Sequence, residues 1–352
     1  MAAVGDGSPR PLIGADRPTV LAGQPSLGFQ PIVDLGSGQL LGFEALLRWA
    51  HPTEGIIRPQ LLIPWAEANG DIVALGEWVL AEGCRQATSW PFSVQLAVNC
   101  SLVQLRRGVA APAVASALEA SGLPSDRLTV EVTEHSMSDE AAVDQLRAIA
   151  ALGVQLAVDD VGTSWNSIEI LRRLAVNTIK IDQSFVNGLE STEGINRMVV
   201  QSVVHLAHSC GMATIAEGVE SARHAGIVRE FECDAAQGYF FAPPLDEENA
   251  TKLANVENLR FPLEGQGWIE GDDWPFRGAH AETPPLGGLP SGGPGRSGLL
   301  DGIDVVDLAL DKDGEPEPRG PYAIGDDGPI SLDDLGLDPE DPGGPASAEP
   351  AG

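Results

Sequence analysis

Short apolar runs alternate with longer amphipathic segments along the middle of this chain. Eight of the runs have the length and composition of strands, and most are separated by stretches with apolar residues at helical spacing. The predicted strands are Phe29–Val33, Leu40–Trp49, Val94–Asn99, Leu128–Thr133, Gln155–Asp159, Thr178–Ile181, Ala213–Ala216 and Ala236–Phe241. Their near-continuous apolar interiors indicate strands covered on both faces, as in a closed barrel.

The connections between the strands support this fold. Apolar residues recur at i, i+3, i+4 and i+7 in Ile72–Trp90, Asp139–Leu152 and Asn196–Cys210, and Ser138 is the predicted N-cap of the second of these helices. Only the Gly-Ser-Gly segment 36–38 joins the first two strands, which is too short for a helical crossover. This pair should therefore be antiparallel. The pattern predicts an α/β protein built as a (β/α)₈ barrel.

Composition predicts three regions: a disordered leader at 1–26, a folded barrel at 27–258, and a disordered acidic tail at 264–352. The tail holds 20 Asp and Glu against four Lys and Arg, together with 13 Pro and 19 Gly. Such a segment has too little apolar surface to offset the entropy lost on ordering. The sequence does not identify a partner for the tail.

The charge of the chain excludes one class of function. The net charge is −30, from 51 acidic and 21 basic residues, and no basic stripe is present, so DNA or RNA binding is not expected. The four cysteines are far apart and form no Cys-x-x-Cys pair, which fits a reduced, cytoplasmic protein. No uninterrupted apolar run approaches 18 residues, so no membrane span is expected.

Polar side chains recur where the apolar runs end. Because the ends of parallel barrel strands meet at one mouth, residues far apart in sequence should surround a single pocket there. Carboxylate and amide oxygens are the ligands that Mg²⁺ prefers, so the pattern predicts metal-assisted phosphoester chemistry. The residues are Glu44, Asn99, Glu131, Asp159, Asp160, Lys180 and Glu217.

The adjacent pair Asp159-Asp160 is the most informative of these positions. Neighbouring carboxylates repel each other in a pocket of low dielectric, and a shared cation removes that cost. Consecutive strand residues point to opposite faces, so both can reach one site only where the strand breaks, and Gly162 is predicted to permit the break. Asp182 follows Lys180 at the end of the next strand in the same manner.

With these motifs the chain resembles the EAL-domain phosphodiesterases, which hydrolyse bacterial cyclic diguanylate (c-di-GMP). The resemblance runs from about Leu27 to Val256. The motifs that carry it, in order, are Phe29-Gln30-Pro31-Ile32, Glu44-Ala45-Leu46-Leu47-Arg48, Val98-Asn99, Glu131-Val132-Thr133-Glu134, Asp159-Asp160, Lys180-Ile181-Asp182, Ala216-Glu217-Gly218-Val219-Glu220 and Gln237-Gly238-Tyr239. The resemblance implies a modified (β/α)₈ (TIM) barrel with one antiparallel strand.

The resemblance also implies a role for each of these residues. Glu44, Asn99, Glu131 and Asp159 are expected to bind one Mg²⁺ or Mn²⁺ and Asp159 and Asp160 a second, with Glu217 supporting the site through water. Lys180 is expected to position the attacking water and help to deprotonate it. The expected substrate contacts are Gln30, Arg48 and Gln237, and the residues expected to brace the site are Glu134, Glu220 and Asp182.

One loop departs from the family pattern. The family loop after the paired aspartates usually reads Asp-Phe-Gly-Thr-Gly-Tyr-Ser-Ser-Leu, whereas residues 160–168 read Asp-Val-Gly-Thr-Ser-Trp-Asn-Ser-Ile. In the family this loop couples metal binding to a dimer interface, so slow turnover and a homodimer are both open alternatives.

The resemblance predicts a phosphodiesterase that converts c-di-GMP to linear pGpG. The alternative is an EAL-type receptor that binds c-di-GMP without efficient turnover. A third alternative, a scaffold that binds no nucleotide, would be expected to have lost Glu44 or Asp159, and the chain retains both.

Overall fold

The computed structural model describes residues 23–52, 55–161, 174, 176–190 and 194–264 of the chain. Strands and helices alternate along these residues, as the apolar pattern predicts. The strands are β1 Gln24–Asp34, β2 Leu40–His51, β3 Gly55–Ile57, β4 Gln95–Asn99, β5 Leu128–Thr133, β6 Gln155–Val161, β7 Thr178–Ile181, β8 Ala213–Ala216 and β9 Ala235–Ala236. The α-helices are α1 Pro59–Asn69, α2 Ile72–Ala87, α3 Leu102–Arg106, α4 Ala110–Ser121, α5 Glu140–Ala151, α7 Gln183–Asn187, α8 Ile195–Ser209, α9 Ala222–Glu230 and α10 Glu247–Ala254, and the 3₁₀ turns are η2 Ser125–Arg127, η3 Glu134–Ser138 and η4 Gly188–Glu190.

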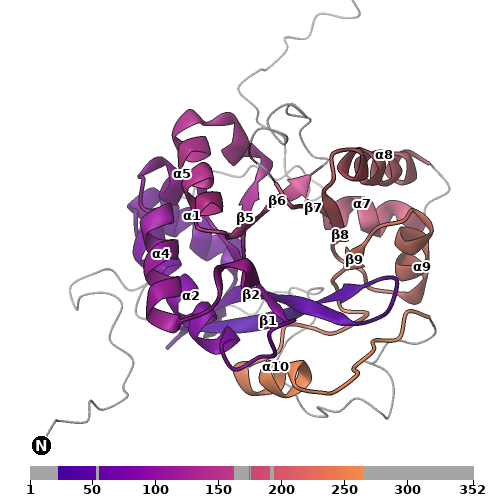
Figure 1. Ribbon diagram of the computed structural model, residues 1–352, viewed down its shortest axis with the longest axis horizontal. Coiled ribbons are helices and arrows are strands. Elements are labelled where there is room, and N and C mark those ends of the chain that lie inside the picture. The colour runs from indigo at the N-terminus through magenta and orange to yellow at the C-terminus, as the bar shows by residue number, and fades with distance from the viewer. Residues whose placement is uncertain (1–22, 53–54, 162–173, 175, 191–193, 265–352) are drawn as a thin grey trace, which may run out of the picture. The chain divides into compact units, whose positions relative to one another are not determined.

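The strands close into a barrel. Around the ring the order is β1, β9, β8, β7, β6, β5, β4 and β2, and β2 pairs again with β1, while β3 extends the sheet beside β2. Strand β1 is antiparallel to both of its neighbours, and the other neighbouring pairs of the ring are parallel. Figure 1 shows helices α2, α4 and α5 on one side of the barrel and α7, α8 and α9 on the other. The predicted barrel with one antiparallel strand is confirmed.

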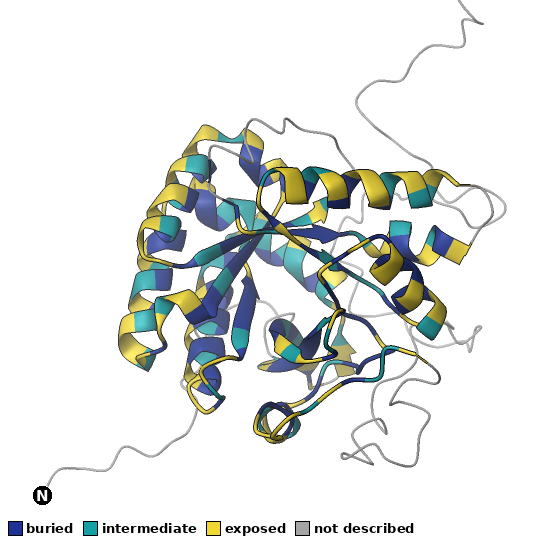
Figure 2. Ribbon diagram, turned by 45° about the vertical axis from the view of Figure 1, so that its right-hand side comes forward, coloured by how far each residue is buried: buried dark blue, intermediate teal, exposed yellow. Residues whose placement is uncertain are grey.

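The main core lies between the strands and the surrounding helices. Strand residues that face helices, such as Leu128 and Ile179, are fully buried, whereas the outer faces of the helices are exposed (Figure 2). On the antiparallel side, the rings of Phe29, Phe43 and Trp90 pack with centroids 4.9 to 6.4 Å apart. Such aromatic contacts add about 1 kcal/mol each beyond the area that they bury, so they hold β1 and β2 against the turn that follows α2.

The hairpin of β1 and β2 is longer than predicted, because these strands pair with each other far beyond the ring. The last predicted strand is wrong beyond Ala236. Gly238 has φ 155°, and the backbone turns there, with the amide of Phe241 donating to the carbonyl of Gly238 at 3.0 Å. Gln237 therefore follows the last strand instead of beginning it.

The predicted N-cap of α5 is also wrong by one residue. The carboxylate of Asp139, not the hydroxyl of Ser138, accepts from the amide of Ala142 at 2.9 Å. An aspartate at this position also adds a negative charge at the positive end of the helix dipole.

Three predictions concern residues outside the described ranges. These are the leader up to residue 22, the tail from residue 265 on, and the departures from the family loop between 162 and 168. Among the described helices, none combines the length and the apolar character needed to cross a membrane.

Candidate active site

Lys180 stands at the centre of the polar cluster that the sequence predicts. Its side chain is completely buried, and Nζ lies 2.6 Å from Glu217 Oε1, 2.8 Å from Glu131 Oε2 and 3.1 Å from Glu44 Oε2. Asp159 Oδ1 is slightly further away, at 3.7 Å. These carboxylates come from β2, β5, β6 and the residue after β8, so closure of the barrel brings them together around one ammonium group.

Glu44 accepts further hydrogen bonds in this cluster besides the one from Lys180. The sequence placed it at a strand end, but it lies in the middle of β2, where it pairs across the hairpin with Gln30. Its Oε1 accepts from Asn99 Nδ2 at 2.6 Å, and its Oε2 accepts from Gln237 Nε2 at 2.7 Å. Glu44 thus joins β4, β7 and the end of β9 through three hydrogen bonds.

The two adjacent aspartates converge because β6 breaks between them. The register between β6 and β7 shifts between Val158 and Val161, and Asp160 has φ 59°, a left-handed conformation that aspartate tolerates better than most residues. The amide of Asp160 donates to Asp159 Oδ1 at 3.0 Å. An irregularity of β6 is therefore present at Asp160, whereas the break predicted at Gly162 lies outside the described residues.

The oxygen atoms of this cluster fit a hard divalent cation. Asp159, Asp160 and Glu217 each place one carboxylate oxygen within 4.8 Å of the others. Two further oxygens, Glu131 Oε1 and Gln237 Oε1, are buried and have no hydrogen-bond partner among the described residues. An all-oxygen set of carboxylates and amides suits Mg²⁺ or Mn²⁺ and offers nothing to a soft metal.

The charge state of Lys180 follows from its surroundings. Burial alone would lower its pKa, but the carboxylates of Glu131, Glu217, Glu44 and Asp159 outweigh burial and raise the pKa well above its ordinary value. The side chain is therefore an ammonium group at neutral pH, and it donates hydrogen bonds to the carboxylates around it.

The pKa values of the carboxyl groups around Lys180 shift in different directions. Burial raises the pKa of Glu131 well above its ordinary value, and burial with the nearby charges of Asp159 and Glu44 raises that of Glu217 to about 8. Burial and the charge of Asp159 raise the pKa of Asp160 to about 6. Burial also opposes ionisation of Glu44, but Lys180 and the hydrogen bonds from Gln237 and Asn99 outweigh it and lower its pKa. Once ionised, these carboxylates carry more negative charge than one lysine balances, and a divalent cation would favour their ionised forms.

The predicted substrate contacts lie on the side of β1 and β2. Arg48 is half-buried and donates from Nη1 to the carbonyl of Leu47 at 3.1 Å. Burial lowers the pKa of its guanidinium, while Tyr239 and Glu44 act in the opposite direction, which places Arg48 close to both. Gln30 is 9% exposed beside Glu44, whereas the amide of Gln237 points to Glu44 and, at 3.3 Å, to Glu217.

The three predicted bracing residues occupy different positions. Asp182 caps α7, accepting from the amide of Ser184 at 3.0 Å, and shares a hydrogen bond with Asp160. Glu134 is buried at the start of η3, directly after β5. Glu220 is exposed before α9, and its amide donates to His224 Nδ1 at 3.4 Å.

A backbone contact that the sequence did not predict fixes Glu217 relative to Gln237. The amide of Val219 donates to the carbonyl of Gln237 at 3.1 Å, and its carbonyl accepts from the amide of Phe240 at 2.9 Å. A Cβ atom at Gly238 would lie 2.2 Å from the carbonyl oxygen of Val219, so only glycine permits this approach. The Gln-Gly pair was recognised as a motif, but nothing local in the sequence identifies Val219 as its partner.

We expect Gly238→Ala to reduce stability and to displace both side chains from Lys180. The cost should be about 1–3 kcal/mol, the range for forced overpacking, and chemical denaturation measures it. Gly226→Ala in α9 is the matched control, because a Cβ there meets nothing within 4 Å and alanine favours helix. Equal stability of the two variants would contradict the tight contact.

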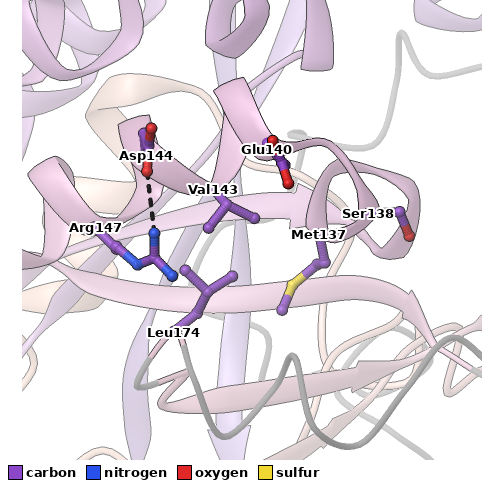
Figure 3. Close-up of a pocket in the computed structure, with 7 residues that line it drawn as sticks. All are labelled: Met137, Ser138, Glu140, Val143, Asp144, Arg147 and Leu174. Carbon is purple, nitrogen blue, oxygen red and sulfur yellow. Dashed lines mark hydrogen bonds and ion pairs between the residues drawn. The ribbon is translucent and has the colours of Figure 1, made fainter.

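Two cavities near the mouth of the barrel differ in their relation to the site. One, of about 490 Å³, lies between β2, α1, α2 and α3; it is lined mainly by apolar side chains and reaches Asn99 and Thr133. The other, of about 290 Å³, lies between η3, α5 and Leu174, where Asp144 and Arg147 form an ion pair at 3.0 Å (Figure 3). Asn99 lines the first cavity, whereas none of the predicted site residues lines the second, so of these two cavities the first adjoins the site.

The chain is similar to a known protein family and to several of its members. The model of the EAL domain family matches residues 17–244, well over half of the chain. The cyclic di-GMP phosphodiesterase NbdA of Pseudomonas aeruginosa is 36% identical over 228 residues, which are 63% of this chain and 29% of NbdA. The chain spans less than a third of the length of NbdA and of two other strongly matching curated relatives.

Solved structures match the barrel as well. The PaMucR phosphodiesterase in complex with c-di-GMP superposes with a TM-score of 0.62 at 35% identity, covering 64% of this chain and 94% of that chain. BlrP1 of Klebsiella pneumoniae, solved with calcium and c-di-GMP, superposes with a TM-score of 0.56 at 28% identity, covering 62% of this chain and 55% of that chain.

Proposed function

The chain belongs to the EAL domain family, and we propose that it hydrolyses c-di-GMP to linear pGpG with two divalent cations, Mg²⁺ or Mn²⁺, at the Lys180 site. The observation that carries this proposal is the complete set of oxygen ligands around Lys180, with Asp159, Asp160 and Glu217 close enough to share cations. The names of NbdA and of the PaMucR and BlrP1 complexes concern those proteins, and they support the choice of substrate.

In this reaction the oxygen of a water molecule forms a bond to phosphorus, the bond to the leaving ribose oxygen breaks, and that oxygen takes up a proton. When bound, divalent cations lower the pKa of bound water and stabilise charge on the attacking and leaving oxygens. Glu44, Asn99, Glu131 and Asp159 would hold one cation, and Asp159 with Asp160 a second. Lys180 donates hydrogen bonds, so its task at the floor of the site is to orient the attacking water and the carboxylates.

The rest of the mouth suits a dianionic dinucleotide. Arg48 can add a fork-shaped contact to a phosphate, which the net charge of the chain would otherwise repel. The cavity of about 490 Å³ beside Asn99 has the apolar walls that a planar base requires. Gln30 lies on β1, directly across from Glu44.

The first test is incubation of the purified full chain with c-di-GMP and Mg²⁺ or Mn²⁺, followed by chromatography of the products. We expect linear pGpG with either metal, no product after chelation with EDTA, and inhibition by Ca²⁺, whose longer and less regular bonds disturb the spacing of ligands. Tight binding of c-di-GMP without any linear product would favour the receptor alternative.

A second prediction distinguishes the backbone conformation of Asp160 from the proposed role of its carboxylate as a metal ligand. Asparagine also tolerates the left-handed conformation, so Asp160→Asn should keep the stability of the protein but raise the Mg²⁺ concentration needed for half-maximal rate. Asp160→Ala should show the same metal effect and, in addition, lose about 1–2 kcal/mol of stability because of the strained φ. Metal titration and urea denaturation of both variants are the measurements. A wild-type metal requirement in Asp160→Asn would exclude this carboxylate as a ligand.

A further inference from the structure

Behind the carboxylates, the interior of the barrel is hollow. A cavity of about 260 Å³ lies inside the ring of strands toward their N-terminal ends. In most barrels of this class bulky branched side chains fill that space in layers. Many of the residues that line the cavity are small or polar, among them Ala97, Thr129, Ala157, Thr178 and Ala213, while Ile32, Leu41 and Ile215 supply its apolar walls. We call this cavity the rear well.

The rear well follows directly from the strands that carry the site. Side chains two positions apart on a strand point to the same face. Thr129 therefore lies beneath Glu131, Thr178 beneath Lys180 and Ala157 beneath Asp159. The same five strands supply residues to both spaces. Residues near their C-terminal ends build the site, and residues nearer their N-terminal ends line the well, so the two spaces are one layer of side chains apart.

Exposure along the strands shows that the well opens to solvent at the N-terminal end. Gln95, Thr129, Gln155 and Thr178 are partly exposed although they point into the barrel, whereas Leu128, which points outward under the helices, is fully buried. One layer higher the exposure falls to 4% at Ala97 and to 1% at Ala157 and Glu131. The well is therefore open to solvent at the N-terminal end, and its inner end lies among buried residues.

Two features line the inner end. A small apolar cluster, separate from the main core, consists of Ile32, Ala97 and Ala235 with Ile215 packed against it. Two charged residues line the well, Glu131 and Asp234, and the carboxylate of Asp234 is bound to Thr214 and His208. Glu131 is the one that contacts Lys180, whose Nζ donates to its Oε2 at 2.8 Å. Its Oε1 is buried and has no hydrogen-bond partner among the residues that the structure describes.

We infer that the rear well holds a column of ordered water that ends on Glu131 and connects the metal-binding layer with solvent from the N-terminal end of the barrel. The cavity has room for several water molecules at ~30 Å³ each, and its hydroxyl and amide side chains supply the partners that buried water needs. If the proposed hydrolysis is correct, water reaches the site from behind while the dinucleotide covers the mouth. This last consequence rests on the proposed function, and the water column itself does not.

A crystal structure at high resolution, with and without xenon under pressure, tests the column directly. We expect ordered water along the well, one molecule within hydrogen-bond distance of Glu131, and no uptake of xenon. An empty well that binds xenon, as dry apolar cavities do, would overturn the inference. A well that holds neither ordered water nor xenon would also overturn it. This experiment does not depend on turnover, so it decides the inference even if the proposed hydrolysis fails.

Substitution at Thr178 tests the consequence for the reaction. Thr178→Leu fills the well with a longer apolar side chain without touching a carboxylate, and Thr178→Ser is the matched control that keeps the hydroxyl. We expect the leucine variant to retain its melting temperature, to lose the water beside Glu131 in its crystal structure, and to turn over c-di-GMP severalfold more slowly at unchanged KM. The serine variant should match the wild type.

Thr129→Leu, paired with Thr129→Ser, repeats the experiment from β5 if the first leucine variant does not fold. Wild-type turnover in a folded leucine variant that has lost the water would overturn the supply of water from behind. An equal loss of rate in the serine and leucine variants would overturn it too, because then the effect would come from the strand and not from the well.

Discussion

Glu44→Gln should reduce the hydrolysis of c-di-GMP by more than ~100-fold, beyond the range typical of residues that only orient a metal ligand. A glutamine side chain has nearly the same shape, so the backbone of β2 should not move. It cannot, however, accept hydrogen bonds at both ends. Oε1 of Glu44 accepts from Asn99 and Oε2 from both Lys180 and Gln237, so an amide nitrogen at either position would face a donor. The substitution also removes one negative charge from the proposed cation site.

Rates under saturating Mg²⁺ measure this effect, and calorimetric titration of metal into the variant gives a readout that does not require turnover. Glu77→Gln, on the exposed face of α2, is the matched control and should behave as the wild type. If Glu44→Gln bound metal and turned over substrate normally, the cation would have to lie elsewhere in the barrel, and the role proposed for Lys180 would lose its basis.

The sequence predicted that these polar side chains converge because their signal is repeated. A single Glu in an apolar run is weak evidence for a functional site. Seven polar residues on successive strands of a barrel are stronger evidence, because the strand ends meet at one mouth. The structure brings Glu44, Glu131, Asp159 and Glu217 to one ammonium group, as that reasoning requires. The alternation of strand and helix likewise predicted the barrel, and the short segment 36–38 predicted its antiparallel strand.

What the sequence could not predict depends on contacts between distant segments. Glu44 lies inside β2 because β2 continues as a hairpin with β1, and hairpin length is decided by pairing along both strands. The last strand ends at Ala236 because Gly238 must approach Val219, which comes from another loop. The sequence did not predict the rear well for a similar reason. Each small residue that lines it is ordinary in its own strand, and only the closed ring shows the cavity that the described strands leave between them.

The central position of Lys180 raises a question that the ligand set alone does not answer. A lysine among acidic side chains competes with a bound cation for the same negative charge. Its ammonium group, however, contacts one oxygen of each carboxylate, and Glu131 keeps its other oxygen free of partners within the described part of the chain. Lys180 can therefore hold the carboxylates together before metal arrives and remain in place afterwards.

Lys180→Met should consequently destabilise the metal-free protein much more than the metal-bound protein. Methionine fills a similar volume but leaves four carboxylates without their positive charge, and two of them, Glu44 and Glu131, are buried. Removing one partner of a buried ion pair costs about 3–5 kcal/mol. Part of that cost should disappear with Mg²⁺, because the cation can neutralise Glu217 and its neighbours. Urea denaturation in EDTA and in Mg²⁺ measures the difference, and turnover should be lost in both conditions. Lys252→Met on α10 removes an exposed ion pair with Glu248 and is the control, expected to cost no more than about 0.5 kcal/mol. Equal losses of stability for the two lysine variants in EDTA would mean that Lys180 does not balance the carboxylate cluster, and that the cluster takes up protons instead.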